Sequence, residues 1–364
     1  MTVGSVEGFA AAPAVRRARV APLLLAFGVL LLASMAFSAG CGAMPVSLRT
    51  TLEALWGGIR GQTEGFDAVH AILWNLRLPR VFMAALVGAS LACSGAAMQG
   101  LFRNPLADPY LLGVASGASF GATLGMAFRG QLGSAFAELP FASSRGQSLV
   151  PLFAFAGAVA AVAATLTLTR GRGRAKAPSI LLAGIVVGSV LTSLTTYLMM
   201  RDADRLRAAF AWGLGNLAVA SWGTVLGITP YAGAGMALLF ALARGLDALQ
   251  LGDDTARTLG VDTRRVRLGV LVGASLSTAA AVSFVGIIGF VGLAAPHVVR
   301  RLGAATHRGL LPTSALAGGT LLVLSDLGAR TLIRPAELPV GIVTTLIGGP
   351  FFLWLLRRQA WPSC

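Results

Sequence analysis

The charged side chains that could do chemistry in this chain gather in one polar interval, residues 249–267, with the sequence LQLGDDTARTLGVDTRRVR. Gly252 and the two aspartates after it are typical of a helix start, because carboxylates suit free N–H groups and the positive end of a helix dipole. Gly260 is placed to close that helix, and Asp262 can cap a second one. The interval is too polar for a lipid interior. It predicts either a solvated loop or a helix that docks a soluble partner.

Catalytic motifs are missing from the sequence. The histidines at 70, 297 and 307 and the three cysteines are far apart, without metal-ligand spacing. The single lysine, Lys176, lies in RAKAPS, so the chain has no Walker A motif for ATP. No HExxH motif and no nucleophile–base pair is visible. We therefore expect no catalytic residue, no metal site and no cofactor, and we interpret the chain as a non-enzyme.

The composition indicates a polytopic membrane protein. Of 364 residues, 55% are hydrophobic and 12% are charged, against about 25% charged in a soluble domain. The apolar runs are long enough to cross about 30 Å of hydrocarbon as helices. The net charge of +15 lies on arginines that cluster at the ends of these runs. Membrane topology explains that charge better than nucleic-acid binding does, so we expect an all-α protein embedded in a lipid bilayer.

The apolar runs predict ten spans within one transmembrane domain, residues 20–358, with tails 1–19 and 359–364 in the cytoplasm. Arginines before the first span and the basic break at 170–178 favour this orientation. The hexapeptide LVGASL occurs at 86–91 and again at 271–276. An inverted-topology repeat would produce this echo, and so would chance. The expected spans are about 20–39, 80–100, 110–128, 149–169, 179–200, 222–243, 268–285, a short one within 286–303, 311–327 and 340–356.

Glycine recurs at every fourth position of the third span, at Gly113, Gly117, Gly121 and Gly125. Residues four apart share one face of a helix, so these glycines would form a bare stripe. Such a stripe lets a second helix approach closely. We predict a helix-packing role for all four.

A break with two prolines, Pro105 and Pro109, lies in LFRNPLADPYLLG at 101–113. Two prolines this close stop a helix, and at membrane depth such a break is tolerated only inside protein or beside a water-filled path. Charge within the predicted spans is nearly absent. A proton-coupled carrier needs buried titratable groups, so the energy for transport would come from another chain.

Several long motifs together closely resemble the FecCD-type permeases of ABC importers for ferric siderophores, haem and cobalamin. The resemblance covers the chain from about residue 75 to the end. The motifs are RLPR at 77–80, LVGASL with SGAAMQGLFRNPLADPYLLGVASG at 86–117, LGDDTARTLGV at 251–261, GFVGLAAPHVVRRLG at 289–303, HRGLLP at 307–312 and AELPVGIVTTLIGGPFFLWLL at 336–356.

The resemblance implies a multi-pass permease in the inner membrane, paired with a second copy or with a paralogue around a central path. Two ATP-binding cassette ATPase subunits would bind on the cytoplasmic side, and a periplasmic or lipid-anchored substrate-binding protein on the other. The loop after the sixth span would be the coupling helix for the ATPase. The matching positions are Gly252, Asp253, Asp254, Ala256, Arg257, Leu259 and Gly260.

The resemblance also implies gate and docking residues. Asn104, Pro105 and Leu106 would form a cytoplasmic gate. Ala177 and Pro178 match a second gate, where small hydroxyl residues of the family's best-known member are replaced. Outer arginines of the family take acidic patches of the binding protein, because the guanidinium fork grips a carboxylate. The matching positions are Arg77, Arg80 and Arg330, although Arg77 and Arg80 could also reach lipid phosphates.

We therefore interpret the chain as the permease of an ABC importer that carries a ferric siderophore or a related iron chelate. Cobalamin and haem are the alternative substrates within the same family. A stand-alone secondary carrier or channel is an alternative of a different class, and uptake without any ATPase would support it. An intramembrane enzyme is a third, and the missing nucleophile–base pair counts against it.

Overall fold

The computed structural model describes residues 20–41, 51, 53, 56, 67–132, 149–169, 177–200, 203–333 and 335–358. The expected tails, 1–19 and 359–364, lie outside the described residues. Throughout the described part, all regular secondary structure is helical, which confirms the all-α class. The helices are α1 (Val20–Gly40), α3 (Asp67–Ile72), η1 (Leu73–Arg77), α4 (Leu78–Phe102), η2 (Pro109–Leu112), α5 (Val114–Leu132), α6 (Leu149–Leu168), α7 (Ala177–Met199), α8 (Ala203–Gly213), α9 (Trp222–Ala241), α10 (Ala243–Gln250), α11 (Asp253–Thr258), α12 (Thr263–Val285), α13 (Val291–Arg301), α14 (His307–Thr331) and α15 (Val340–Arg358).

Seven helices of the described part are long and apolar enough to cross a membrane. They are α1, the continuous helix His70–Phe102, α6, α7, α9, α12 and α14. Val114–Phe128 and Val340–Leu355 are shorter apolar helices. Helix α13 has 11 residues, a length of about 16 Å that covers roughly half of the hydrocarbon core. Ten spans and the side on which the termini lie therefore remain predictions.

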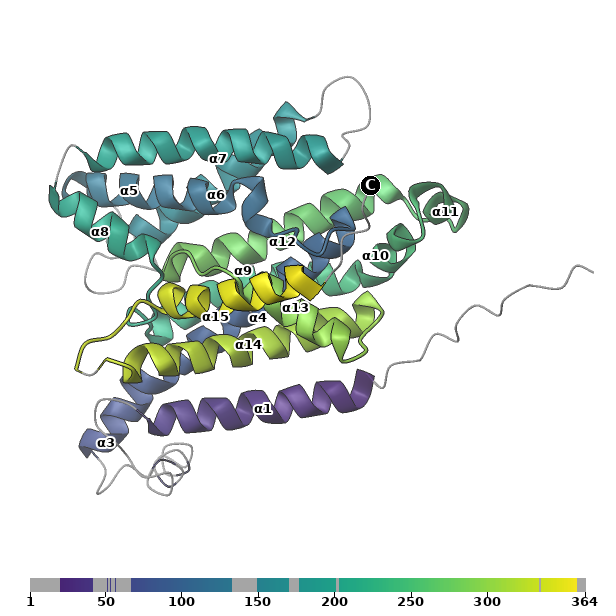
Figure 1. The fold of residues 1–364 in the computed structure, drawn as a ribbon. Helices are drawn as coiled ribbons and strands as arrows, with labels where there is room; N and C mark the ends of the chain where they lie inside the picture. The colour runs from purple at the N-terminus through teal and green to yellow at the C-terminus, as the bar shows by residue number, and fades with distance from the viewer. Residues whose placement is uncertain are drawn as a thin grey trace, which may run out of the picture.

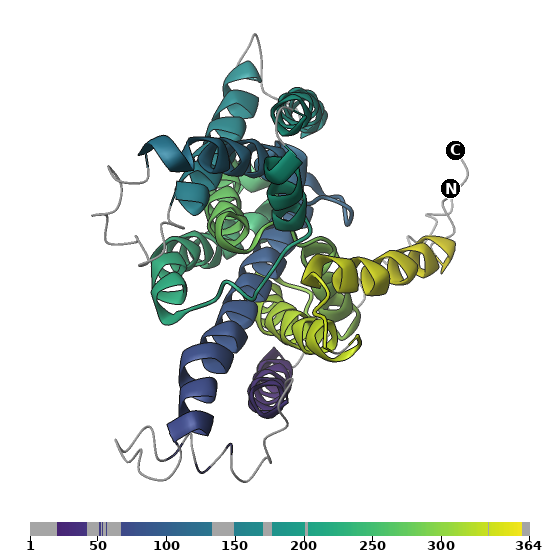
Figure 2. The same ribbon diagram turned by 90° about the vertical axis from the view of Figure 1, so that its left-hand side faces the viewer.

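Helix α4 is the centre of the bundle (Figure 2). It packs against α12, α13 and α14, while α5, α6 and α7 lie on one flank and α1 lies against α14 on the other. The small residues of α4 allow its neighbours to pack closely against it. A Cβ on Gly88 would lie 2.3 Å from the carbonyl oxygen of Gly318, and one on Gly95 would lie 2.0 Å from that of Gly292. The backbones of the neighbouring helices therefore meet α4 directly.

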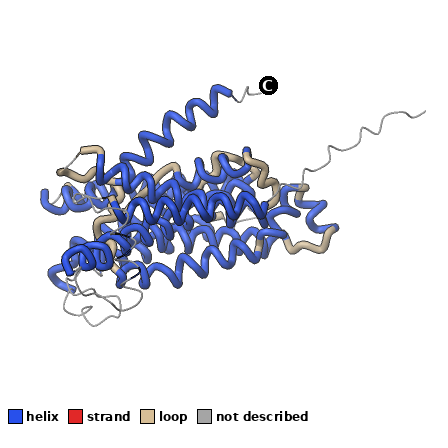
Figure 3. Tube along the Cα trace, turned by 90° about the horizontal axis from the view of Figure 1, so that it is seen from below, coloured by secondary structure: helices blue, strands red, loops and turns tan. Residues whose placement is uncertain are grey.

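The helices run back and forth between two ends of the bundle (Figure 1). Helices α10 and α11 project at one end, which is also where α1 begins and α15 ends. Helix α15 leans away from the other helices toward its C-terminus (Figure 3). The beginning of α1 and the end of α15 therefore lie at the same end of the bundle as α11.

The repeated hexapeptide LVGASL lies on α4 and α12, two central helices that run in opposite directions. Helix α4 ends beside α11, whereas α12 begins there. The glycine of each copy abuts a glycine of a neighbouring helix, Gly88 against Gly318 and Gly273 against Gly235. The glycine of each copy therefore lets a neighbouring helix approach closely. This similarity favours the predicted inverted repeat.

Three of the four stripe glycines pack α5 against α6. A Cβ on Gly117 would lie 2.4 Å from the carbonyl oxygen of Gly157, and one on Gly121 would lie 2.0 Å from that of Phe153. Gly125 has backbone atoms of Leu149 and Val150 at 3.0 Å. Gly113 is different, because it ends η2 with a φ of +85° and precedes α5. The third span was expected to begin at 110 and to include it, but the proline-induced 3-10 turn delays the helix to Val114.

We expect Gly121→Ala to lower the stability of the purified protein by about 1–3 kcal/mol, the usual cost of overpacking. The added methyl would meet the backbone of Phe153, which cannot rotate aside as the end of a flexible side chain can. Thermal unfolding in detergent measures the effect. Gly28→Ala on α1 is the matched control, since a Cβ there has nothing within 4 Å. Equal melting temperatures for the two variants would contradict the packing role.

Candidate functional site

The polar interval contains the short helix α11, a glycine turn after it, and the beginning of the long helix α12. Gly252 precedes α11 with a φ of +113°, and Gly260 follows it with a φ of +78°. The N–H groups of Gly260 and Val261 close the turn on carbonyls of α11, at 2.9 and 3.0 Å. Asp262 then caps α12 by accepting from the backbone N–H groups of Arg264 and Arg265 at 3.1 and 3.0 Å. The glycine closure and the second cap are as the sequence predicts.

The first aspartate of α11, Asp253, forms ion pairs within the chain that the sequence does not predict. Gly252 is the N-cap and makes no side-chain cap hydrogen bond. The carboxylate of Asp253 turns inward, 2.6 Å from the guanidinium of Arg267 and 3.3 Å from that of Arg103. Asp254 points outward with its side chain 97% exposed, at 3.5 Å from Arg257. The two neighbouring aspartates therefore serve opposite faces of α11.

Helix α11 presents an outer face to solvent. Ala256 is buried against the chain, while Asp254, Arg257 and Leu259 are exposed. An exposed leucine between charged residues, on a short helix that projects from the end of the bundle, suits contact with another protein.

The proline-broken loop after α4 is held by its own side chains. The amide oxygen of Asn104 accepts from the N–H of Leu106 at 2.9 Å, and the carboxylate of Asp108 accepts from that of Tyr110 at 2.8 Å. The hydroxyl of Tyr110 donates to the carbonyl of Ile288 at 3.0 Å. Burial raises the pKa of Asp108 to about 6, although the Tyr110 N–H opposes that shift. Hydrogen bonds therefore hold the loop together and join it to the segment between α12 and α13.

A set of hydrogen bonds, which we call the α4–α11 clasp, joins this loop to α10 and α11. Arg103 ends α4 in the left-handed region, with a φ of +50°. Its guanidinium donates to the carbonyl of Leu249 and to Asp253. The side-chain amide of Gln250 donates to the carbonyl of Gly100 at 2.6 Å. A displacement of α11 would therefore act directly on the end of α4.

The HRGLLP motif, at the start of α14, contacts both α10 and the end of α4. His307 begins α14, and its backbone N–H and its ring Nδ1 both lie 2.7 Å from the carboxylate of Asp247 on α10. A Cβ on Gly100 would lie 2.2 Å from the His307 ring. Helices α4, α10 and α14 are therefore packed tightly at the end that carries α11.

The second expected gate lies at the start of α7. Ala177 is its first residue, and Pro178 is exposed. Helix α7 packs against η2. A Cβ on Gly184 would lie 2.0 Å from the carbonyl oxygen of Leu111. Helix α7 therefore contacts the turn that follows residues 104–106.

The three outer arginines, for which the resemblance implies a docking role, are largely buried, and that role stays a prediction. Arg77 and Arg330 are 7% and 6% exposed. Arg77 donates to the carbonyls of Ala39 and Gly40, both at 2.9 Å. Arg330 donates to the hydroxyl of Ser38 at 2.6 Å and pairs with Asp326 at 3.0 Å. These guanidinium groups close the C-terminal end of α1, where free carbonyls and the helix dipole favour a cation.

Asp326 holds this cluster together from α14. Its carboxylate lies 2.9 Å from Arg80 as well as 3.0 Å from Arg330, and it is 1% exposed. Arg80 also contacts Glu337 at 2.8 Å. The few charged side chains near this span end therefore form a buried ion-pair network between α4 and α14, and hydrogen bonds from Arg77 and Arg330 join α1 to it.

Comparison with known proteins gives the family. Residues 30–358 match the FecCD transport family. The hemin transport system permease HmuU of Yersinia pestis is 41% identical over 354 residues, covering 94% of this chain and 97% of the relative. The cobalamin import permease BtuC of Halobacterium salinarum is 38% identical over 375 residues, with 94% and 97% covered.

The fold has a solved counterpart. An inward-facing metal-chelate-type ABC transporter matches with a TM-score of 0.78 and 28% identity, over 93% of this chain and 100% of that one. Sequence and fold thus agree over nearly the whole chain. The protein belongs to the FecCD transport family of ABC permeases, which are transport subunits and not enzymes.

Proposed function

We propose that this FecCD-type permease carries an iron chelate across the inner membrane, and that this chelate is a ferric siderophore. Separate subunits would hydrolyse the ATP that drives transport. The observation that carries the proposal is the α4–α11 clasp. It ties an exposed helix, suited to a soluble partner, to the proline-broken loop that could open or close a path.

In this proposal residues 252–260 of each permease copy dock one of the two ATPase subunits. The exposed side chains of Asp254, Arg257 and Leu259 would contact the partner. Asp253 would carry the motion inward through Arg103. Because Arg103 caps α4, the force would reach the loop at Asn104, Pro105 and Leu106, the proposed cytoplasmic gate.

The remaining partners follow from the family. A second permease copy would complete the path, and a periplasmic or lipid-anchored binding protein would deliver the substrate. Ala177 and Pro178 would form the second part of the gate, facing the same loop through α7 and η2. The outer arginines stay the predicted docking residues for the binding protein, although their guanidinium groups have partners within the chain.

The chemistry of the cargo is a metal ion held in a large organic chelator. The named relatives support this class, since haemin is an iron chelate and cobalamin a cobalt chelate, and the solved counterpart is of metal-chelate type. Haem is the second candidate, because the haemin permease reaches 41% identity.

Uptake of labelled ferric siderophore, haem and cobalamin, measured side by side, separates these substrates. The measurement compares a strain that lacks this chain with the same strain after complementation. Loss of ferric siderophore uptake alone supports the proposal. Loss of haem or cobalamin uptake alone keeps the importer and overturns the substrate. Unchanged uptake of all three, in a strain with no second permease, contradicts the proposal.

A further inference from the structure

The first residue of α14, His307, is joined to α10 by two hydrogen bonds to one carboxylate, a contact that we call the α10–α14 joint. The backbone N–H of His307 donates to Asp247 at 2.7 Å, and the ring Nδ1 lies 2.7 Å from the same oxygen. An ionised carboxylate only accepts hydrogen bonds, so Nδ1 carries the proton of the second bond. The side chain of His307 is 5% exposed, so the joint is largely shielded from water.

The joint supplies a cap that α14 does not make for itself. Thr306 is the N-cap of α14 but makes no side-chain cap hydrogen bond. Pro312, inside the helix, has no N–H to donate to the carbonyl of Arg308. The first turn of α14 is therefore weakly tied to its surroundings on both sides. Because Asp247 accepts from the first N–H of the helix, as an N-cap side chain would, the position of α10 fixes the position of this turn.

The imidazole ring of His307 also contacts α4. A side chain on Gly100 would overlap the ring, and the carbonyl of Gly100 accepts from Gln250 of α10 at 2.6 Å. The ring Nε2 is buried and has no hydrogen-bond partner among the described residues. A buried nitrogen without a partner lowers stability, so stability alone does not explain this ring. Its place is where α4, α10 and α14 meet.

Helix α14 connects the joint with the buried ion pairs at the opposite end of the bundle. Asp326 lies about 28 Å along the helix from His307, at 1.5 Å of rise per residue. This length is close to the thickness of the hydrocarbon core, about 30 Å. At that end Asp326 pairs with Arg80 of α4, and Arg330 holds the last residues of α1. Polar contacts with other helices therefore lie near both ends of α14.

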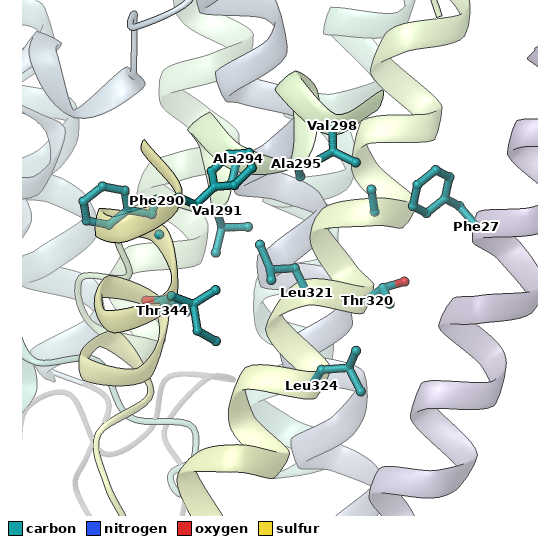
Figure 4. A pocket seen from close by; sticks show the side chains of 14 residues that line it. Phe27, Phe290, Val291, Ala294, Ala295, Val298, Thr320, Leu321, Leu324 and Thr344 are labelled. Carbon is teal, nitrogen blue, oxygen red and sulfur yellow. The ribbon is translucent and has the colours of Figure 1, made fainter. Parts of the chain in front are cut away.

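The middle of α14 is bounded by apolar side chains. Leu321 and Leu324 line an apolar cavity together with Phe27 of α1 and Val291 of α13 (Figure 4). The hydroxyl of Thr320 beside them donates to a carbonyl of its own helix at 2.9 Å. Apolar contacts have no preferred direction, whereas hydrogen bonds do. The contacts at the two ends therefore set the position of α14, and a rigid helix biased at both ends can carry coupling between them.

We infer that His307 is a positioning residue for coupling, which passes the movement of α10 and α11 to the opposite end of α14. The inference rests on the proposed function, in which ATPase subunits move α11. The α4–α11 clasp acts on the loop at 104–106, whereas the α10–α14 joint acts on the ion pairs that hold the end of α1. Coupling between two sites is reciprocal, so the joint also carries the signal of a loaded binding protein to the ATPase subunits.

Stimulation of ATP hydrolysis by the loaded binding protein tests the joint. The full transporter with its ATPase subunits is reconstituted in proteoliposomes, and the binding protein is loaded with a ferric hydroxamate siderophore or, in parallel, with haemin. His307→Leu removes the ring donor, and we expect stimulation to fall about fivefold or more, the lower end of typical coupling between two sites. His307→Asn keeps a side-chain N–H for Asp247 and is expected to retain most of the stimulation.

A double variant tests whether His307 and Asp247 act as one contact. Asp247→Ala removes the acceptor of both hydrogen bonds, and we expect it to lower stimulation at least as much as His307→Leu does. Combining the two changes is expected to add little, because both break the same contact. Gly121→Ala, which weakens the packing of α5 on α6, is the control for lost stability. Its melting temperature falls, while stimulation by the binding protein persists.

The outcomes separate this inference from the proposed function. Equal stimulation of His307→Leu and the unmodified protein, in liposomes that show ATP-driven uptake, would overturn the inference and leave the proposed function standing. Equal losses of stimulation in His307→Leu, His307→Asn and Gly121→Ala would also overturn the inference, since His307 would then only stabilise the fold. Failure of the unmodified protein to take up either cargo with ATP would overturn the proposed function and the inference together.

Discussion

Reversing the charge with Asp253→Lys is expected to lower chelate uptake about tenfold or more while the ATPase subunits still bind. Asp253 faces inward and holds both Arg103 and Arg267. A lysine would turn two attractions into repulsions and break the part of the clasp that joins α4 to α11. Hydrogen bonds between charged groups contribute about 1.5–3 kcal/mol, and 1.4 kcal/mol corresponds to a factor of ten. The signature is ATP hydrolysis without transport.

Asp254→Lys is the matched control for this experiment. Its side chain points outward, and its intrachain partner at 3.5 Å is Arg257. The same charge reversal there leaves the α4–α11 clasp intact and acts on the surface proposed for the ATPase. We expect weaker co-purification of the ATPase subunits in this variant. Uptake by Asp253→Lys equal to that of the unmodified protein would contradict the role of the clasp.

Removing the charge of Asp326 is expected to destabilise the protein by about 3–5 kcal/mol, the usual cost of breaking a buried ion pair from one side. Asp326→Asn leaves Arg80 and Arg330 without their shared anion. Arg330 also holds the last residues of α1, so the loss would spread to that helix. Thermal unfolding in detergent and the yield of folded protein measure the effect.

Glu337→Gln makes the same chemical change on the same cluster at a solvent-exposed position. Glu337 contacts Arg80 at 2.8 Å but its side chain is 46% exposed, and exposed ion pairs contribute about 0–1 kcal/mol. We therefore expect nearly unchanged stability in this variant. A similar loss in both variants, or in neither, would refute the structural role assigned to Asp326.

The sequence predicts the structure of residues 252–262 well because that structure is decided locally. A glycine with positive φ must stand where the chain reverses, and Gly252 and Gly260 do so. The cap at Asp262 involves only the next residues. The apolar helices are equally local, since hydropathy over about twenty residues decides them. The ends of the spans depend on turns that hydropathy does not show. The 3-10 turn at Pro109–Leu112, for example, places Gly113 before the start of α5.

The partners of the charged residues could not be predicted, because they come from distant parts of the chain. Arg103 finds Asp253 across 150 positions, and Arg80 finds Asp326 across 246. Positive charge at an outer span end fits both a docking surface and a structural cluster. The partners in the structural cluster follow from the packing of α1, α4 and α14, which the sequence does not show. The spacing of Asp326 and Arg330, four apart on one helix, is the one local signal of the ion pair.

Transport in proteoliposomes tests the central claim most directly. The vesicles contain this chain with its ATPase subunits, and uptake of labelled iron chelate is measured with the binding protein supplied on the opposite face. We expect uptake that requires ATP on the ATPase side and stops with vanadate. Uptake by this chain alone, without ATPase subunits and insensitive to vanadate, would contradict the role of an ATP-driven permease and identify a stand-alone carrier.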